Sequence, residues 1–251
     1  MIALKNSGSI ATVTLRRPPV NAIDPAFVAA LERVLDEVET AQPTVLVIRS
    51  DQRCFCAGAD LSLIRGLFSA ADGVDRMLIY VRSLHAVFNR LEALEAVTLA
   101  AIDGPALGGG LELALACDLR IATSRARLGL PEARVGMIPG AGGTQRLTRL
   151  CGPGVSSQLI LGGEVIDGAE AARLGVVQWS CAPAELDARI AEISARIAGL
   201  SRGALAASKD CIAAWFDPAA DGYAREIEKP KQIMRTEEAK RFVEAFFNRG
   251  K

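Results

Sequence analysis

One segment of this chain reads Ala106-Leu107-Gly108-Gly109-Gly110-Leu111-Glu112. The residues that follow it, through Cys117, are apolar on every side of a helix, so we expect a helix inside the protein. A glycine run between a strand and such a helix gathers free backbone N–H groups and the positive end of the helix dipole at one point. Glu112 then carries a carboxylate into the interior, where an unpaired charge is costly or has a shifted pKa.

Two plainer interpretations of this segment exist. The glycines can serve only a tight strand-to-helix turn, and Glu112 can be a solvated glutamate that the helix dipole favours in the first turn. A dinucleotide-binding loop fits poorly, because its third glycine would fall on Leu113. We favour the buried carboxylate, since the helix has no obvious polar face.

Glu132 is a second candidate acid, 20 residues after Glu112 and directly after Pro131. Alone, it can equally be an exposed loop carboxylate or an ion-pair partner of Arg134. The run at 139–144 lacks the Gly-Lys-Ser/Thr ending of a phosphate loop. We expect this run to begin a helix, with several N–H groups available for a bound water.

The composition excludes several classes of function. The chain has 251 residues, of which 50% are hydrophobic, enough for one large domain with or without a helical appendage. Its formal net charge of zero argues against a nucleic-acid or membrane-surface partner, and no apolar run is long enough for a membrane span. The N-terminus has no signal-peptide or transit pattern. Six scattered cysteines and one histidine, His85, argue against a metal site and predict reduced thiols in the cytoplasm.

The pattern along the chain is that of an α/β protein. Asp24-Pro25 is typical of a helix N-cap followed by proline in the first turn. From residue 186 onward the chain is predicted to be helical, with Pro218 and Pro230 as breaks. The predicted strands are residues 9–16, 44–50, 97–102, 119–122, 127–130 and 176–179, and a long helix is predicted over about 74–94.

Taken together, these segments resemble the crotonase superfamily, the enoyl-CoA hydratases and isomerases. The set covers essentially the whole chain in the family's order and is far more specific than any one of its pieces. The matching stretches are 17–23, 55–61, 106–115, 117–118, 130–147, 161–177 and 236–249.

The resemblance implies a spiral of ββα units that forms two roughly perpendicular sheets. Residues 1–185 would form this core with the active site, and residues 186–251 a C-terminal α-helical subdomain. In the family that region mediates trimers, often paired into hexamers. The implied substrate is an acyl-CoA thioester, and no cofactor is expected beyond the coenzyme A of the substrate.

The resemblance also implies roles for individual residues. Backbone N–H groups of Ala59 and Gly109 would form an oxyanion hole for the thioester oxygen. Glu112 would act as the base on water, Glu132 would donate a proton to the α-carbon, and the Gly140 N–H would help to hold the water. The implied coenzyme A contacts are Ala57, Asp60, Leu61, Val20, Ala22 and Arg249.

We expect a 2-enoyl-CoA hydratase that gives 3-hydroxyacyl-CoA, in fatty-acid or related acyl-CoA degradation. In the hydratase branch both glutamates are present, as they are here. The alternative is an enoyl-CoA isomerase or another CoA-ester lyase of the superfamily. A non-catalytic RNA-binding member is disfavoured by the neutral charge and the absence of a Lys-rich helix. Ser62 departs from the family pattern, since a lysine often helps to bind coenzyme A phosphates there.

Overall fold

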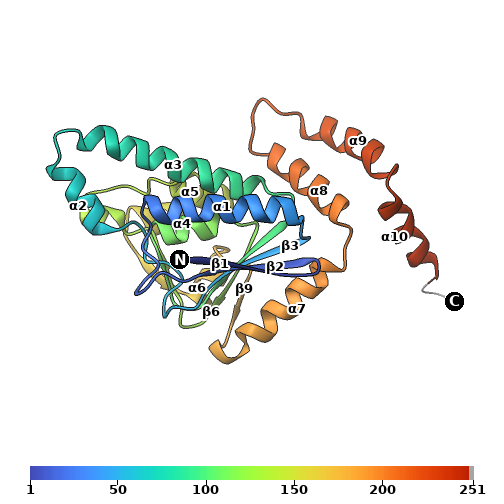
Figure 1. The fold of residues 1–251 in the computed structure, drawn as a ribbon, viewed down its shortest axis with the longest axis horizontal. Helices are drawn as coiled ribbons and strands as arrows, with labels where there is room; N and C mark the ends of the chain where they lie inside the picture. Colours follow the sequence, from blue (N-terminus) through green and yellow to red (C-terminus); the bar gives the residue numbers. More distant parts are fainter. Residues whose placement is uncertain (249–251) are drawn as a thin grey trace.

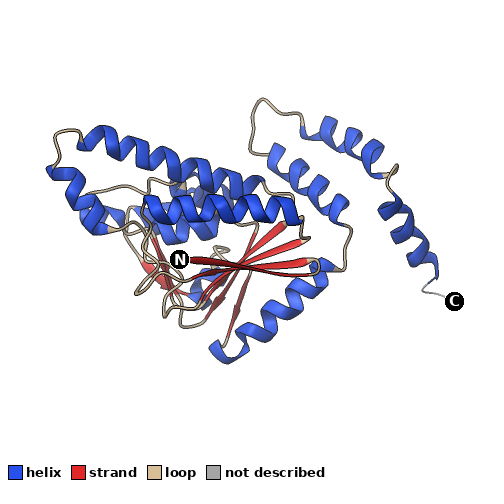
Figure 2. Cartoon of the chain, viewed as in Figure 1, coloured by secondary structure: helices blue, strands red, loops and turns tan. Residues whose placement is uncertain are grey.

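The computed structural model describes residues 1–248, and within them the chain forms two β-sheets surrounded by helices (Figures 1 and 2). The strands are β1 (Ile2–Ser7), β2 (Ile10–Leu15), β3 (Val45–Ser50), β4 (Val97–Ile102), β5 (Pro105–Leu107), β6 (Leu119–Thr123), β7 (Arg127–Gly129), β8 (Val165–Asp167) and β9 (Trp179–Cys181). The α-helices are α1 (Pro25–Ala41), α2 (Leu61–Ser69), α3 (Gly73–Ala93), α4 (Gly109–Leu115), α5 (Gly143–Ile160), α6 (Gly168–Arg173), α7 (Leu186–Ala198), α8 (Arg202–Ala214), α9 (Gly222–Ile233) and α10 (Glu237–Asn248).

The strand order confirms the predicted α/β architecture. The larger sheet has the order β1-β2-β3-β4-β6-β9, with β1 antiparallel to β2 and every later neighbour parallel. The smaller sheet has the order β5-β7-β8, in which β5 and β7 are parallel. From β4 to β7, successive strands of the chain therefore alternate between the two sheets, and α4 lies between β5 and β6 in the sequence.

The larger sheet is buried on both faces. On one face Leu46 and Ile48 pack in the main hydrophobic cluster, which α1 and α3 share. On the other face Val45 and Val47 pack against α7, which lies beneath the sheet in Figure 1. Burial on both faces explains the uninterrupted apolar run of β3, since a parallel strand between two layers has no solvent side.

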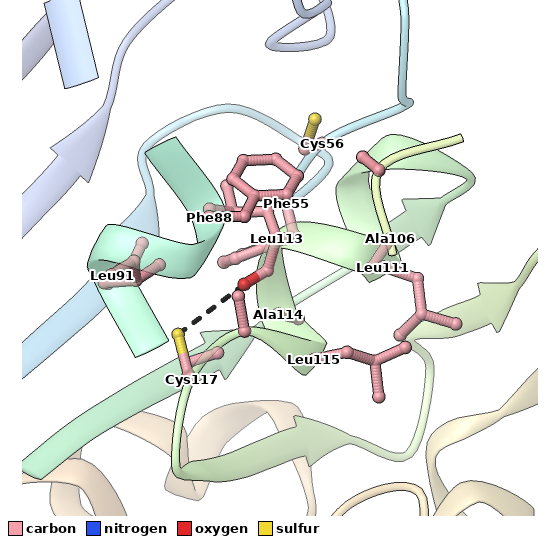
Figure 3. Close-up of a cluster of buried hydrophobic side chains, with 14 of the residues drawn as sticks. Phe55, Cys56, Phe88, Leu91, Ala106, Leu111, Leu113, Ala114, Leu115 and Cys117 are labelled. Atoms are coloured by element: carbon pink, nitrogen blue, oxygen red, sulfur yellow. Dashed lines mark hydrogen bonds between the residues drawn. The ribbon is translucent and has the colours of Figure 1, made fainter. Parts of the chain in front are cut away.

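Helix α4 is enclosed on every side, as its sequence predicts. Figure 3 shows Leu113 pointing toward Phe55 and Phe88, while Leu111 and Leu115 point to another side. Leu111 and Leu113 are fully buried. A short helix without a polar face is stable here because neighbouring elements cover its whole circumference, and it carries Glu112 into the interior with it.

The N-cap at Asp24 is confirmed, because its carboxylate accepts the Phe27 N–H at 2.8 Å. The predicted strand at 176–179 is wrong in its position: Val176 and Val177 fill the main hydrophobic cluster, and the strand β9 begins only at Trp179. Strands β1, β5 and β8 and helix α2 were not predicted from the sequence.

The C-terminal helices α8, α9 and α10 extend to one side of the sheets (Figure 1). Pro218 lies between helices, as predicted, whereas Pro230 is inside α9 and does not break it. Trp215 and Phe246 are exposed on these helices. An interface between copies of the chain stays a prediction.

The boundary between residues 185 and 186 also stays a prediction, and α7 packs on the larger sheet rather than with α8 to α10. Within residues 1–248, no helix combines the length and apolar character that crossing a bilayer demands.

Gly110 provides a test of how closely α4 packs. A Cβ atom at this position would lie 2.0 Å from the backbone carbonyl oxygen of Cys56. Gly110→Ala is therefore expected to lower the free energy of unfolding by about 2 kcal/mol or more, because backbone must move. Gly66→Ala, on the exposed side of α2 with open space around it, is expected to raise it by about 0.5–1 kcal/mol. Urea unfolding of both variants measures this, and equal effects would contradict the packing.

Candidate active site

Glu112 is buried at the centre of the site, with 2% of its surface exposed. Its Oε1 atom accepts two backbone N–H groups, from Ala141 and from Gly143, each at 2.7 Å. Gly143 is the first residue of α5, so the carboxylate also lies at the positive end of that helix dipole. The sequence predicted N–H groups available for water in this turn, but these two are occupied by Glu112.

Two opposing effects act on the ionisation of Glu112. Burial is the larger and raises the pKa of its carboxyl group. The N–H groups of Gly143 and Ala141 and the positive charge of Arg146 oppose this rise, because each favours the carboxylate. The buried charge is thus hydrogen-bonded rather than orphaned, which excludes the solvated interpretation of this residue.

Glu132 reaches the same region from a separate element, the 3₁₀ turn Glu132–Val135. Its carboxylate lies against Gly108, where an added Cβ would be 2.8 Å from Glu132 Oε1. Gly108 has φ 52° and ψ −127°, a conformation that only glycine adopts readily. The glycine therefore serves both the turn into α4 and the close approach of the second acid. Arg134 donates instead to Gly163 O at 2.7 Å, so the alternative interpretation of Glu132 as the ion-pair partner of Arg134 is wrong.

The environment of Glu132 differs from that of Glu112. Its Oε2 atom is buried and has no hydrogen-bond partner among residues 1–248. Burial and, to a smaller extent, the negative charge of the neighbouring Glu112 together raise the pKa of Glu132 to about 7. A buried carboxyl oxygen normally has a hydrogen-bond partner. If Glu132 is protonated and faces the cavity, a polar ligand or a water molecule there would be that partner.

The backbone amides of Ala59 and Gly109 lie side by side. A Cβ on Gly109 would be 3.6 Å from Ala59 N. Among the described residues, neither N–H donates a hydrogen bond. Ala59 is held in place by its bridge to Ile23, and Gly109 is the first residue of α4. Two unpaired donors at a helix start form the arrangement that stabilises a developing oxyanion.

Both acids and both amides line one cavity of about 300 Å³. Gly140 lines it as well, and its N–H donates to no residue within 1–248. The opposite wall is apolar and comes from α2 and α3. That wall is formed by Ile64, Met77, Tyr80, Val81 and Leu84.

The cavity also brings together Ala57 and Leu61 of the predicted coenzyme A contacts. Val20 and Ala22 lie in the neighbouring turn and loop, where Val20 O accepts the Ala57 N–H at 3.0 Å, but they do not line the cavity. Asp60 caps α2 by accepting the Ser62 N–H at 2.8 Å. These coenzyme A contacts stay predictions, and Arg249 lies outside the described residues.

Sequence reasoning missed four residues of the site. Ala141 and Gly143 were missed as the donors to Glu112, and Arg146 was not singled out. Tyr80 is buried in the cavity wall, where its hydroxyl donates to Ile23 O at 2.9 Å. No sequence signal identifies these contacts, because each joins segments far apart in the chain.

Comparisons with known proteins agree with this geometry. The chain matches the family model described as "Enoyl-CoA hydratase/isomerase" over residues 5–251. The short-chain-enoyl-CoA hydratase of Clostridium acetobutylicum is 39% identical over 188 residues, which are 74% of this chain and 70% of that protein. The bovine mitochondrial enoyl-CoA hydratase domain-containing protein 2 is 43% identical over 187 residues, 73% of this chain but only 61% of that protein.

A solved structure, that of an enoyl-CoA hydratase from Bacillus anthracis, superposes with a TM-score of 0.90 at 31% identity, covering 99% of this chain and 96% of that one. The chain therefore belongs to the enoyl-CoA hydratase/isomerase family, within the crotonase superfamily. It is an enzyme of that family, and the fold implied by the sequence resemblance is confirmed.

The raised pKa of Glu132 predicts how stability depends on pH. The folded protein retains a proton on Glu132 between its ordinary value of 4.5 and about 7, whereas the unfolded chain releases it. Stability contributed by this group is therefore lost as the pH rises through that window. Glu132→Gln cannot titrate and so lacks this pH-dependent loss. The free energy of unfolding of the variant, relative to that of wild type, is therefore expected to increase by roughly 1–3 kcal/mol between pH 5 and pH 8.

Urea unfolding at the two pH values measures this difference. Glu37→Gln is the matched control, because Glu37 is exposed on α1, and its effect is expected to be the same at both pH values. A Glu132→Gln effect that does not change with pH would contradict the buried, protonated side chain.

Proposed function

We propose that this protein adds water to 2-enoyl-CoA thioesters and gives 3-hydroxyacyl-CoA. The observation that carries the proposal is the convergence of Glu112 and Glu132 on the cavity that also holds the Ala59 and Gly109 amides. A family member that acts only as an isomerase needs one proton carrier, whereas hydration uses one group for the water and another for the carbon.

The reaction begins with the thioester oxygen against the Ala59 and Gly109 N–H groups. As the oxygen of water bonds to C3, Glu112 takes a proton from the water and negative charge develops on the thioester oxygen. Two fixed donors stabilise this charge without reorganisation, and one such donor is worth about 3–4 kcal/mol in comparable sites. The enolate then collapses as C2 takes a proton from Glu132.

The two carboxyl groups need different protonation states for this sequence. Glu112 accepts two N–H groups and faces the cation of Arg146, and these contacts favour its ionised form against the effect of burial. Glu132 has a pKa of about 7 and a buried oxygen without a donor among residues 1–248, which favours the protonated form. After this step Glu112 is protonated and Glu132 is ionised, and proton exchange with solvent restores the starting state once the product has left.

The apolar wall of α2 and α3 supports the placement of the acyl chain there. The coenzyme A part would then leave the cavity on the side of Ala57 and Leu61. Degradation of fatty acids or related acyl-CoA compounds is the proposed pathway, in the cytoplasm. Assembly into trimers or hexamers through the exposed C-terminal aromatics is part of the same proposal.

Crotonyl-CoA tests the proposal directly. Purified protein is expected to remove the absorbance of the conjugated thioester as water adds. Glu112→Gln and Glu132→Gln are each expected to lower kcat by about 10²–10⁴-fold, because each removes one proton-transfer group. Glu37→Gln, on the exposed side of α1, is expected to keep wild-type activity and serves as the control.

A panel of 2-enoyl-CoA and 3-enoyl-CoA substrates separates hydration from isomerisation. Faster conversion of the 3-enoyl compounds would show that the protein is an isomerase and would contradict the proposal. Wild-type protein that is inactive on 2-enoyl thioesters of every chain length would contradict it.

A further inference from the structure

Arg146 is a buried cation directly behind Glu112. Only 6% of its surface is exposed. The guanidinium donates from Nη1 to Ala141 O at 2.9 Å, from Nε to Glu92 Oε2 at 2.9 Å and from Nη2 to Asn89 Oδ1 at 2.6 Å. Asn89 and Glu92 belong to α3, and Ala141 belongs to the turn before α5. The side chain therefore fastens that turn to a helix more than 50 residues away in the sequence.

The fastened turn is the one that holds Glu112. The carbonyl oxygen of Ala141 accepts a hydrogen bond from Arg146, and the N–H of Ala141 donates to Glu112 Oε1 at 2.7 Å. Gly142, the next residue, has φ 101°, and a Cβ there would lie 2.2 Å from Arg146 Nη1. The turn is thus wrapped onto the guanidinium so closely that only glycine fits between the two N–H donors.

We propose that Arg146, oriented by Asn89 and Glu92, is a positioning residue for Glu112. It fixes the turn whose two amides aim the carboxylate into the cavity, and it supplies a positive charge on the side away from the substrate. The inference rests on the proposed function for its kinetic consequence, since Glu112 is the base in that reaction. The effect of Arg146 on the position and ionisation of Glu112 does not depend on the reaction that the enzyme catalyses.

The charge of Arg146 distinguishes this role from simple packing between α3 and α5. The titratable groups that face Glu112 are Arg146 from α5, Glu132 from the 3₁₀ turn and Tyr80 from α3. Burial raises the pKa of Glu112, and Arg146 is the cation that opposes the rise. A packing residue could be replaced by an apolar one of similar length without moving the ionisation of Glu112.

Arg146→Met and Arg146→Lys test the proposal in the full-length enzyme. Arg146→Met is expected to lower kcat roughly 10²-fold, as small misplacements of a reacting group do, with little change in KM for crotonyl-CoA. The acidic limb of the kcat/KM profile, where the base must ionise, is expected to move to higher pH. Arg146→Lys keeps the positive charge but not the contacts to all three partners. The acidic limb is therefore expected to stay at its wild-type pH, and kcat is expected to fall less than in Arg146→Met.

Arg149→Met is the matched control, because Arg149 is an exposed arginine one turn further along α5. It is expected to leave kcat and the pH profile as in wild type. The proposal is overturned if Arg146→Met retains the wild-type kcat and limb, or if Met and Lys lower kcat equally without moving the limb.

A readout without turnover separates this proposal from the proposed function. Carboxyl carbons of ¹³C-labelled glutamates are followed by NMR as the pH is raised, and Glu112→Gln identifies the Glu112 signal. In Arg146→Met that signal is expected to titrate at higher pH than in wild type. An unchanged titration overturns the positioning role, whereas a shifted titration in a protein that hydrates no enoyl-CoA supports it and removes only the proposed function.

Discussion

Backbone amides that the fold leaves without backbone partners are the constraint on which this site depends. Gly109 begins α4 and Gly143 begins α5, so both N–H groups lie in a first helical turn, where no carbonyl of the same helix can accept them. One pair, from Ala59 and Gly109, faces the cavity, and the other pair, from Ala141 and Gly143, holds the carboxylate of Glu112. The first pair is free to bind the substrate oxygen, and the second pair positions the acid that would act on water.

The two sheets bring these turns together. The chain passes from β4 in the larger sheet to β5 in the smaller one and then directly into α4, so the helix start lies where the sheets meet. Burial of α4 on every side fixes Glu112 without a polar helix face. Helix α3 then braces both halves of the site, through Tyr80 to the segment beside Ala59 and through Asn89 and Glu92 to Arg146.

Local patterns in the sequence were enough to predict many of the helices and strands, and the structure confirms several of them. The strand at Val97–Ile102, the N-cap at Asp24 and the buried helix around Glu112 each depend on residues close together in the chain. The contacts of Glu112 were not predictable, because its two donors lie 29 and 31 residues away and any residue supplies a backbone N–H. The same holds for Glu132, whose burial comes from its approach to Gly108 and not from its own segment. Glu112 and Glu132 were singled out from the sequence itself, whereas their roles and the oxyanion amides of Ala59 and Gly109 came from the family resemblance. The cavity brings all four together.

The central claim is that two preformed N–H donors polarise a thioester carbonyl next to the two acids. The most direct measurement is the vibrational frequency of a ¹³C-labelled thioester carbonyl in crotonyl-CoA bound to the Glu112→Gln, Glu132→Gln double variant, which retains the amides but not the proton carriers. The account predicts a carbonyl stretch at lower frequency than for the same thioester in water, because aligned, desolvated donors stretch the bond more than solvent does. A bound carbonyl at the same frequency as in water, or above it, would contradict the account.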